Sequence, residues 1–133
     1  MKLVGWQHNL RDYLAAQADK PFEWSRNDCG AFAGGAVEAM TGVNPHAKVA
    51  GKYKTAKGAA LALKRLGFGD HIAYAASVMT EIDPAYAGFG DIAVVPGDGG
   101  MALGVVTGTH VEVRAPAGRA VIPLADAVRA FRA

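Results

Sequence analysis

The chain has 133 residues, of which 51% are hydrophobic and 20% charged, so it can bury a core and is not compositionally disordered. Fourteen Lys and Arg against twelve Asp and Glu give a formal net charge of +2, which is too weak to indicate a nucleic-acid or membrane-surface binder. The length fits one domain over residues 1–133, and no apolar run is long enough for a membrane span or a signal-peptide core.

The first half of the sequence predicts helices. Apolar residues at helical spacing, together with start and stop residues, predict helices over residues 5–18, 29–41, 56–66 and 71–79, the last with a strand as the alternative. The expected N-caps are Asp28 or Asn27 for the second helix, Thr55 for the third and Asp70 for the fourth. Gly42 is expected to end the second helix.

From Gly90 onward the sequence changes to short β-branched runs separated by turns. We expect strands over residues 91–96, 102–107, 110–114 and 119–122, joined by turns at 97–100, 108–109 and 115–118 as an antiparallel meander. Pro123, followed by Leu124, Val128 and Phe131, predicts a terminal helix. Helices followed by a sheet define an α+β fold class.

Cys29 is the residue most suited to chemistry. It stands at the predicted start of a helix, where free amide donors and the helix dipole favour a thiolate nucleophile. The alternative is a core cysteine, because Cys29 shares a helix face with Phe32 and Met40. A single cysteine excludes internal disulfides, and the four histidines are far apart in sequence, so we expect no metal and no cofactor.

Three stretches together resemble a known family. They are the run PFEWSRNDC at residues 21–29, the pair GD at residues 90–91 and the run LGVVTG at residues 103–108. The chain resembles the NlpC-type papain-like cell-wall cysteine peptidases, and more closely a small family of unknown function from phage and prophage tail modules. This resemblance implies that the helix starting at Cys29 packs on an antiparallel sheet. In the peptidases that cysteine attacks a peptidoglycan-stem amide, and a strand supplies the histidine base.

The resemblance also implies that the catalytic pair is lost. The family histidine falls on Ala102, and the polar residue that orients it falls on Arg114, a cation without an acceptor. We expect Ala102 and Arg114 to face each other across a hairpin near Cys29. Of the histidines, His46 lies in the loop after the cysteine helix and is the one best placed to replace the base. His71, beside the expected cap, is interpreted as structural.

The resemblance implies a structural or assembly component of a phage tail tip, with other tail proteins as partners, found in the virion tail and in the host cytoplasm during assembly. A cleft that binds a peptidoglycan peptide is compatible with this role. Two alternatives stay open: an active peptidoglycan endopeptidase or amidase using Cys29 with an unusual base, and a cytoplasmic binding module. Leu3, Val4 and Phe131 are apolar residues near the two ends, and we expect them to bind partners.

Overall fold

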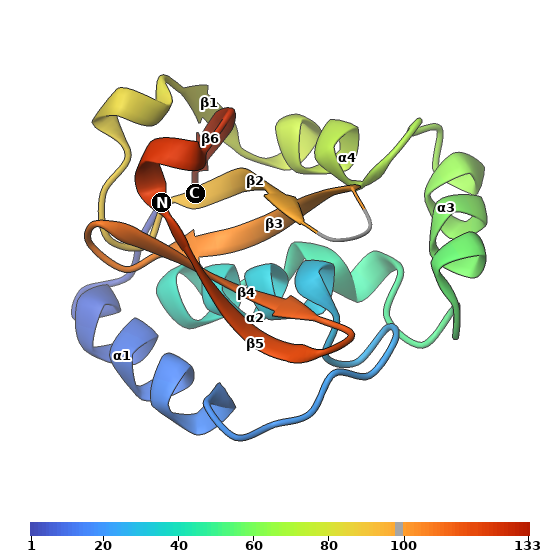
Figure 1. Cartoon of the computed structure of the whole chain (residues 1–133), viewed down its shortest axis with the longest axis horizontal. Coiled ribbons are helices and arrows are strands. Elements are labelled where there is room, and N and C mark those ends of the chain that lie inside the picture. Colours follow the sequence, from blue (N-terminus) through green and yellow to red (C-terminus); the bar gives the residue numbers. More distant parts are fainter. Residues whose placement is uncertain (98–99) are drawn as a thin grey trace.

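The computed structural model describes residues 1–97 and 100–133 and is an α+β fold (Figure 1). Its helices are α1 (Trp6–Gln17), α2 (Cys29–Thr41), α3 (Ala56–Arg65) and α4 (His71–Val78), with short 3-10 turns η1 (Pro45–Lys48), η2 (Pro84–Tyr86) and η3 (Leu124–Asp126). Its strands are β1 (Thr80–Ile82), β2 (Ile92–Gly97), β3 (Gly100–Val106), β4 (His110–Ala115), β5 (Gly118–Pro123) and β6 (Arg129–Arg132). None of the helices in the described part of the chain is long and apolar enough to cross a bilayer.

Side-chain caps fix the helix starts where the sequence predicts them. The carboxylate of Asp28 accepts from the Ala31 N–H at 2.8 Å, and Thr55 and Asp70 cap α3 and α4 in the same way. Gly42 ends α2 with a φ of 85°, a conformation that glycine adopts without strain. All four predicted helices are therefore confirmed within one or two residues of their expected starts, and residues 71–78 are a helix and not a strand.

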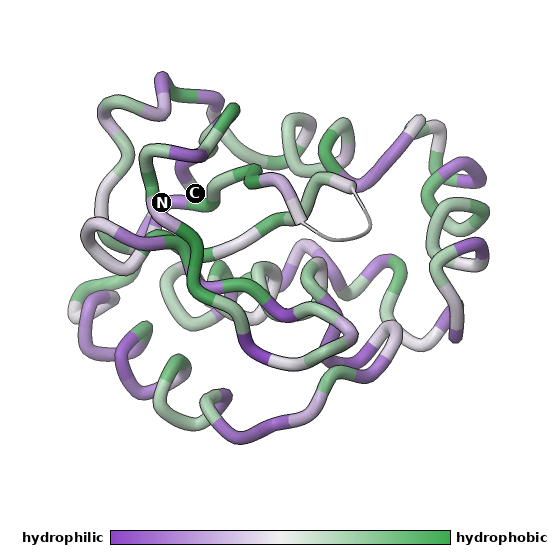
Figure 2. The backbone as a smooth tube through the Cα atoms, viewed as in Figure 1, coloured by the Kyte–Doolittle hydropathy of each residue, from purple (hydrophilic) through white to green (hydrophobic). Residues whose placement is uncertain are grey.

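The six strands form one antiparallel sheet in the order β1-β6-β2-β3-β4-β5. The four predicted strands are confirmed as β2 to β5, whereas β1 was not predicted. Residues 98 and 99 of the expected turn at 97–100 lie outside the described residues. In Figure 2 the central strands are largely green, and the outer face of α1 is largely purple.

Alternation along the strands gives the sheet two buried faces. One face packs against α1 and α2, and it contributes five residues of the main core: Ile92, Val94, Leu103, Val105 and Phe131. The other face contributes a second cluster: Ala93, Val95, Val106, Val111 and Val113. Ala120 and Ile122 of β5 and Leu124 of η3 pack against this cluster. The start of α2 is thereby held against β3.

The predicted C-terminal helix is wrong. After η3 the chain is extended and enters the sheet as β6, between β1 and β2. Phe131 pairs with Ile92 on one side and Glu81 on the other, and its side chain has no exposed surface. The apolar spacing that suggests a helix also fits a turn followed by a buried strand, and the pairing with two distant strands decides between them. Phe131 therefore belongs to the core and is not a partner-binding residue.

The N-terminal apolar residues are exposed, as the sequence predicts. Val4 projects fully into solvent, while Leu3 is about half-exposed and its N–H donates to the Met40 carbonyl at 2.8 Å. The two ends of the chain lie side by side, because Lys2 Nζ donates to the carbonyl of Ala133 at 3.2 Å (Figure 1). A role of Leu3 and Val4 in binding stays a prediction.

Candidate functional site around Cys29

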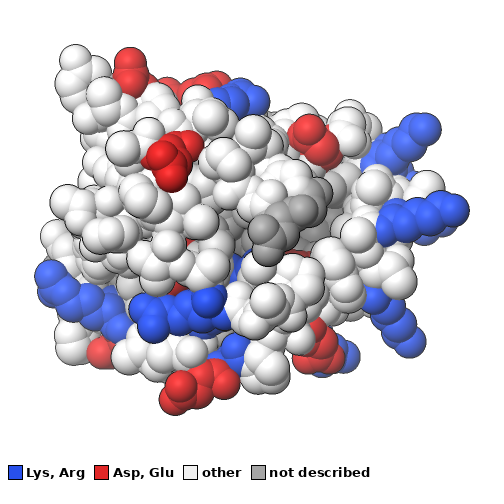
Figure 3. All heavy atoms as spheres, viewed as in Figure 1, with Lys and Arg blue, Asp and Glu red and all other residues white. Residues whose placement is uncertain are grey.

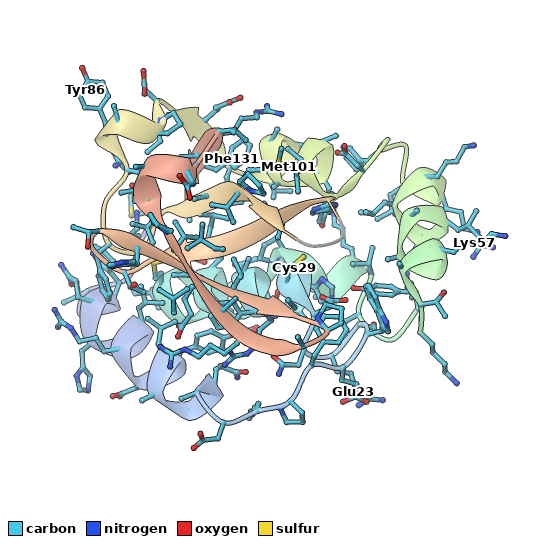
Figure 4. The ribbon with its side chains drawn as sticks, viewed as in Figure 1. Glu23, Cys29, Lys57, Tyr86, Met101 and Phe131 are labelled. Atoms are coloured by element: carbon cyan, nitrogen blue, oxygen red, sulfur yellow. The ribbon has the colours of Figure 1, made fainter. Side chains whose placement is uncertain are left out.

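Cys29 is the first residue of α2, and its half-buried side chain lies between this helix and β3 (Figure 4). Burial raises the pKa of its thiol above the ordinary value. A hydrogen bond from the backbone N–H of Leu103 opposes this effect, and the nearby charge of Asp28 adds to it. The balance keeps the sulfur protonated near neutral pH, which is the opposite of what an activated nucleophile needs.

The Leu103 N–H is available because β4 leaves β3 early. The two strands pair only at Val105↔Glu112 and Val106↔Val111. The Thr107 N–H donates to the His110 carbonyl on the β4 side. Every second residue before Thr107, which includes Val105 and Leu103, therefore also directs its backbone N–H and C=O toward the β4 side. Leu103 follows the same alternation, and beyond the last pair its N–H meets the start of α2. Ala102 precedes Leu103, so its side chain lies on the opposite face of the sheet from α2 and the thiol.

The expectation that Ala102 and Arg114 face each other is wrong. They lie on the adjacent strands β3 and β4, but the pairing ends before it reaches them. Arg114 is 1% exposed, donates to the carbonyl of Gln17 at the end of α1, and holds its guanidinium 4.9 Å from the centre of the Phe32 ring. Arg114 is thus a core residue below α1 and has no contact with the position that a catalytic histidine would occupy.

A buried polar network fixes the loop that precedes Cys29. Besides capping α2, the Asp28 carboxylate accepts from the Ser25 N–H at 2.8 Å and from the Tyr53 hydroxyl. Burial and this bond to Asp28 raise the pKa of Tyr53. Ser25, the non-glycine residue with a positive φ of 73°, accepts from the Gly51 N–H through its hydroxyl. The network ties two loops to the start of α2. The sequence predicts Asp28 as a helix cap but not its bonds to Ser25 and Tyr53.

His46 reaches the start of α2 but on a different face from Cys29. Its Nε2 donates to the Ser25 carbonyl at 2.8 Å, and the residue is buried. The ring packs beside Gly30 and Gly34, where a Cβ on Gly34 would lie 2.6 Å from the His46 Cβ. Gly30 is one residue after Cys29, so its face is turned by about 100° around the helix. His46 therefore reaches the start of the helix, but its contacts assign it to packing and do not support its expected role as a replacement base.

His71 is the histidine that approaches the same strand edge as Cys29. It is the first residue of α4, and its Nε2 donates to the Met101 carbonyl at 3.0 Å. Met101 precedes Leu103 by two residues, so this carbonyl and the Leu103 N–H point to the same side of β3. Sequence reasoning missed the relation because it depends on how α4 docks against a strand thirty residues away.

A hollow of about 430 Å³ opens beside the start of α2, away from the sheet. Its lining consists of Ser25, Arg26, Ala31, Asn44, His46, Ala50 and Gly51. Among residues 1–97 and 100–133 no three His, Cys, Asp or Glu side chains gather closely enough to hold a metal ion. Cys29 is not part of this lining, so the hollow is separate from the thiol, which meets backbone donors instead.

The chain matches a known family model. The model of a domain of unknown function, DUF6950, matches residues 1–133. No curated protein matches the chain.

Proposed function

The chain belongs to the DUF6950 family, and we propose that this member is a structural or assembly component of a phage or prophage tail, built on an NlpC-type papain-like fold that has lost its hydrolytic chemistry. The observation that carries the proposal is the setting of the helix-start Cys29. The thiol meets the backbone of Leu103, while position 102, where the resemblance expects the histidine, is an alanine whose side chain packs on the opposite face of the sheet.

The chemistry of amide hydrolysis supports the loss of activity. A cysteine hydrolase needs a base that removes the thiol proton and an acid that protonates the leaving amine. Ala102 supplies neither, and Arg114 is committed to the core below α1. Burial also raises the pKa of the Cys29 thiol. A domain with these properties is suited to binding and not to turnover.

The pair GD at residues 90–91, the second of the three stretches that carry the resemblance, also has a structural explanation. Asp91 is 3% exposed, its carboxylate accepts from the Gly88 N–H at 2.8 Å, and it pairs with Arg132 at 2.8 Å. These contacts fasten the entry to β2 to the end of β6. The pair Gly90-Asp91 thus supports the sheet that carries position 102, without a part in catalysis.

Assembly of particles tests the proposed role. Tail modules expressed with and without the gene for this chain should differ in completed tails, and a Cys29→Ser variant should restore assembly as well as the natural sequence does. Normal infectious particles formed without the protein would overturn the proposal, as would complementation that requires the thiol.

The placement of His71 favours a second candidate, an active cysteine hydrolase of peptidoglycan. Its Nε2 donates to the Met101 carbonyl, which leaves Nδ1 free of that bond on the edge that also receives Cys29. Purified sacculi distinguish the two functions. Release of stem peptides that both Cys29→Ser and His71→Ala abolish, with His110→Ala as the matched control, would establish hydrolysis. The absence of release would support the assembly role.

A further inference from the structure

The positive charge of the chain is concentrated in one segment. Residues 39–69 contain no Asp or Glu and six cations: Lys48, Lys52, Lys54, Lys57, Lys64 and Arg65. The rest of the chain has eight Lys or Arg against twelve Asp or Glu, a formal net charge of −4. The small overall charge therefore hides a strongly polarised molecule. We call residues 48–65 the basic segment.

The cations of the basic segment are all exposed. Three arginines of the sheet form ion pairs: Arg119 with Glu112, Arg129 with Glu81 and Arg132 with Asp91. Within residues 1–97 and 100–133, no acidic side chain forms an ion pair with a cation of the basic segment. Figure 3 shows blue side chains projecting along the edge formed by α3, and Figure 4 shows Lys57 pointing away from the body of the protein.

The basic segment is held in place before any partner binds. Ala62 and Leu63 of α3 are buried in a hydrophobic cluster with Tyr53 and Tyr74. The Tyr53 hydroxyl donates to Asp28, and the Tyr74 hydroxyl donates to a carbonyl at the start of η1. A charged surface on an ordered scaffold loses little entropy on binding.

An apolar residue lies among these charges. Leu61 is 46% exposed on α3 and stands four residues after Lys57 and three before Lys64. Residues at these spacings share one face of a helix. The exposed face of α3 therefore combines cations with an apolar contact point, which is the composition of a protein-binding surface with a charged rim.

From these observations we propose that the basic segment is a docking surface for an acidic segment of a partner protein. Nucleic acid fits the surface less well, because Tyr53, the aromatic residue of the segment, is buried and cannot stack on bases. Five of the six cations are lysines, which lack the planar fork that reads base edges. The negative remainder of the protein also repels a long phosphate chain beyond the patch.

This inference goes beyond the proposed function, because it concerns a surface separate from the Cys29 site and holds for any protein partner.

The probe is a fluorescein-labelled peptide of about twelve residues, mostly Glu with two Leu, and its binding is measured by fluorescence polarisation at low salt. The double variant Lys57→Gln/Lys64→Gln should weaken binding about fivefold, and added salt should weaken it further. The control Lys2→Gln/Lys20→Gln removes the same charge elsewhere and should change the affinity less than about twofold.

Three results would overturn the proposal. They are no measurable binding of the peptide, an equal loss for the two double variants, and tighter binding of a single-stranded oligonucleotide of equal length and charge. Leu61→Ser tests the apolar contact separately from charge. It should weaken binding of the peptide and leave binding of the oligonucleotide unchanged. Because none of these variants touches Cys29 or β3, failure here leaves the assembly proposal to its own test.

Discussion

Placing histidine at position 102 should leave the Cys29 thiol unactivated. The side chain at 102 packs on the sheet face away from α2, against the cluster that holds Val95 and Val106, whereas Leu103, whose N–H meets Cys29, faces α2. At pH 7 a cysteine of ordinary pKa, about 8.5, is roughly 3% thiolate, and Cys29 is below that level because burial raises its pKa. An imidazolium in contact with the thiol would bring its pKa to about 7 or lower and the thiolate to about half. Reduced intrinsic nucleophilicity would cancel a factor of about five, so such a contact would make alkylation at least about threefold faster.

The assay is the pH dependence of iodoacetamide alkylation of the folded protein, followed by mass spectrometry. Its midpoint in Ala102→His should equal that of the natural sequence, because the new side chain lies across the sheet from the thiol. Ala120→His, on β5, is the matched control for an added histidine and should also leave the midpoint unchanged. Equal thermal melting of the two variants shows that both remain folded. A midpoint lower by at least about 1.5 pH units in folded Ala102→His would refute the placement of this side chain on the face away from the thiol.

Three further variants test the fold. Phe131→Ala should lower the free energy of unfolding by about 3–5 kcal/mol, measured by urea denaturation, because the ring is fully buried; a cost under about 1 kcal/mol would contradict its place in the core. Gly104→Ala should cost more than about 2 kcal/mol, since its Cβ would lie 2.5 Å from valine side chains of β4, whereas Gly69→Ala, with nothing within 4 Å, should be near neutral. Tyr53→Phe should cost about 1–2 kcal/mol at pH 7. It should also remove part of the alkaline loss of stability, because the raised folded pKa of Tyr53 lets the native state keep a proton that the unfolded chain releases above about pH 10. An unchanged alkaline profile would contradict the burial of Tyr53, which is the main cause of its raised pKa, together with its bond to Asp28.

Features decided within a few residues could be predicted from the sequence. The caps at Asp28, Thr55 and Asp70 and the stop at Gly42 depend on side chains bonding to backbone three residues away or on a local φ, and all are present. The hairpin strands follow from turn residues and alternation. These signals require no knowledge of the rest of the chain.

Features that depend on distant partners could not be predicted. The place of Phe131 is fixed by pairing with β1 and β2, and the burial of Arg114 by the carbonyl that α1 presents to it. The relation of His71 to the edge of β3 likewise needs the docking of α4. The sequence therefore predicts a cysteine at a helix start, which is a local feature. It does not predict the neighbours of that cysteine, because they depend on tertiary contacts.

The position of β6 has a consequence for biosynthesis. Strands β1 and β2 are joined only through β6, the last of the three to leave the ribosome. Until it emerges, each of them presents an open backbone edge, and the core lacks a fully buried ring. Sheets closed by a late strand fold slowly and expose edges that can pair with other chains. We therefore expect the nascent protein to be most open to pairing with other chains before β6 closes the gap.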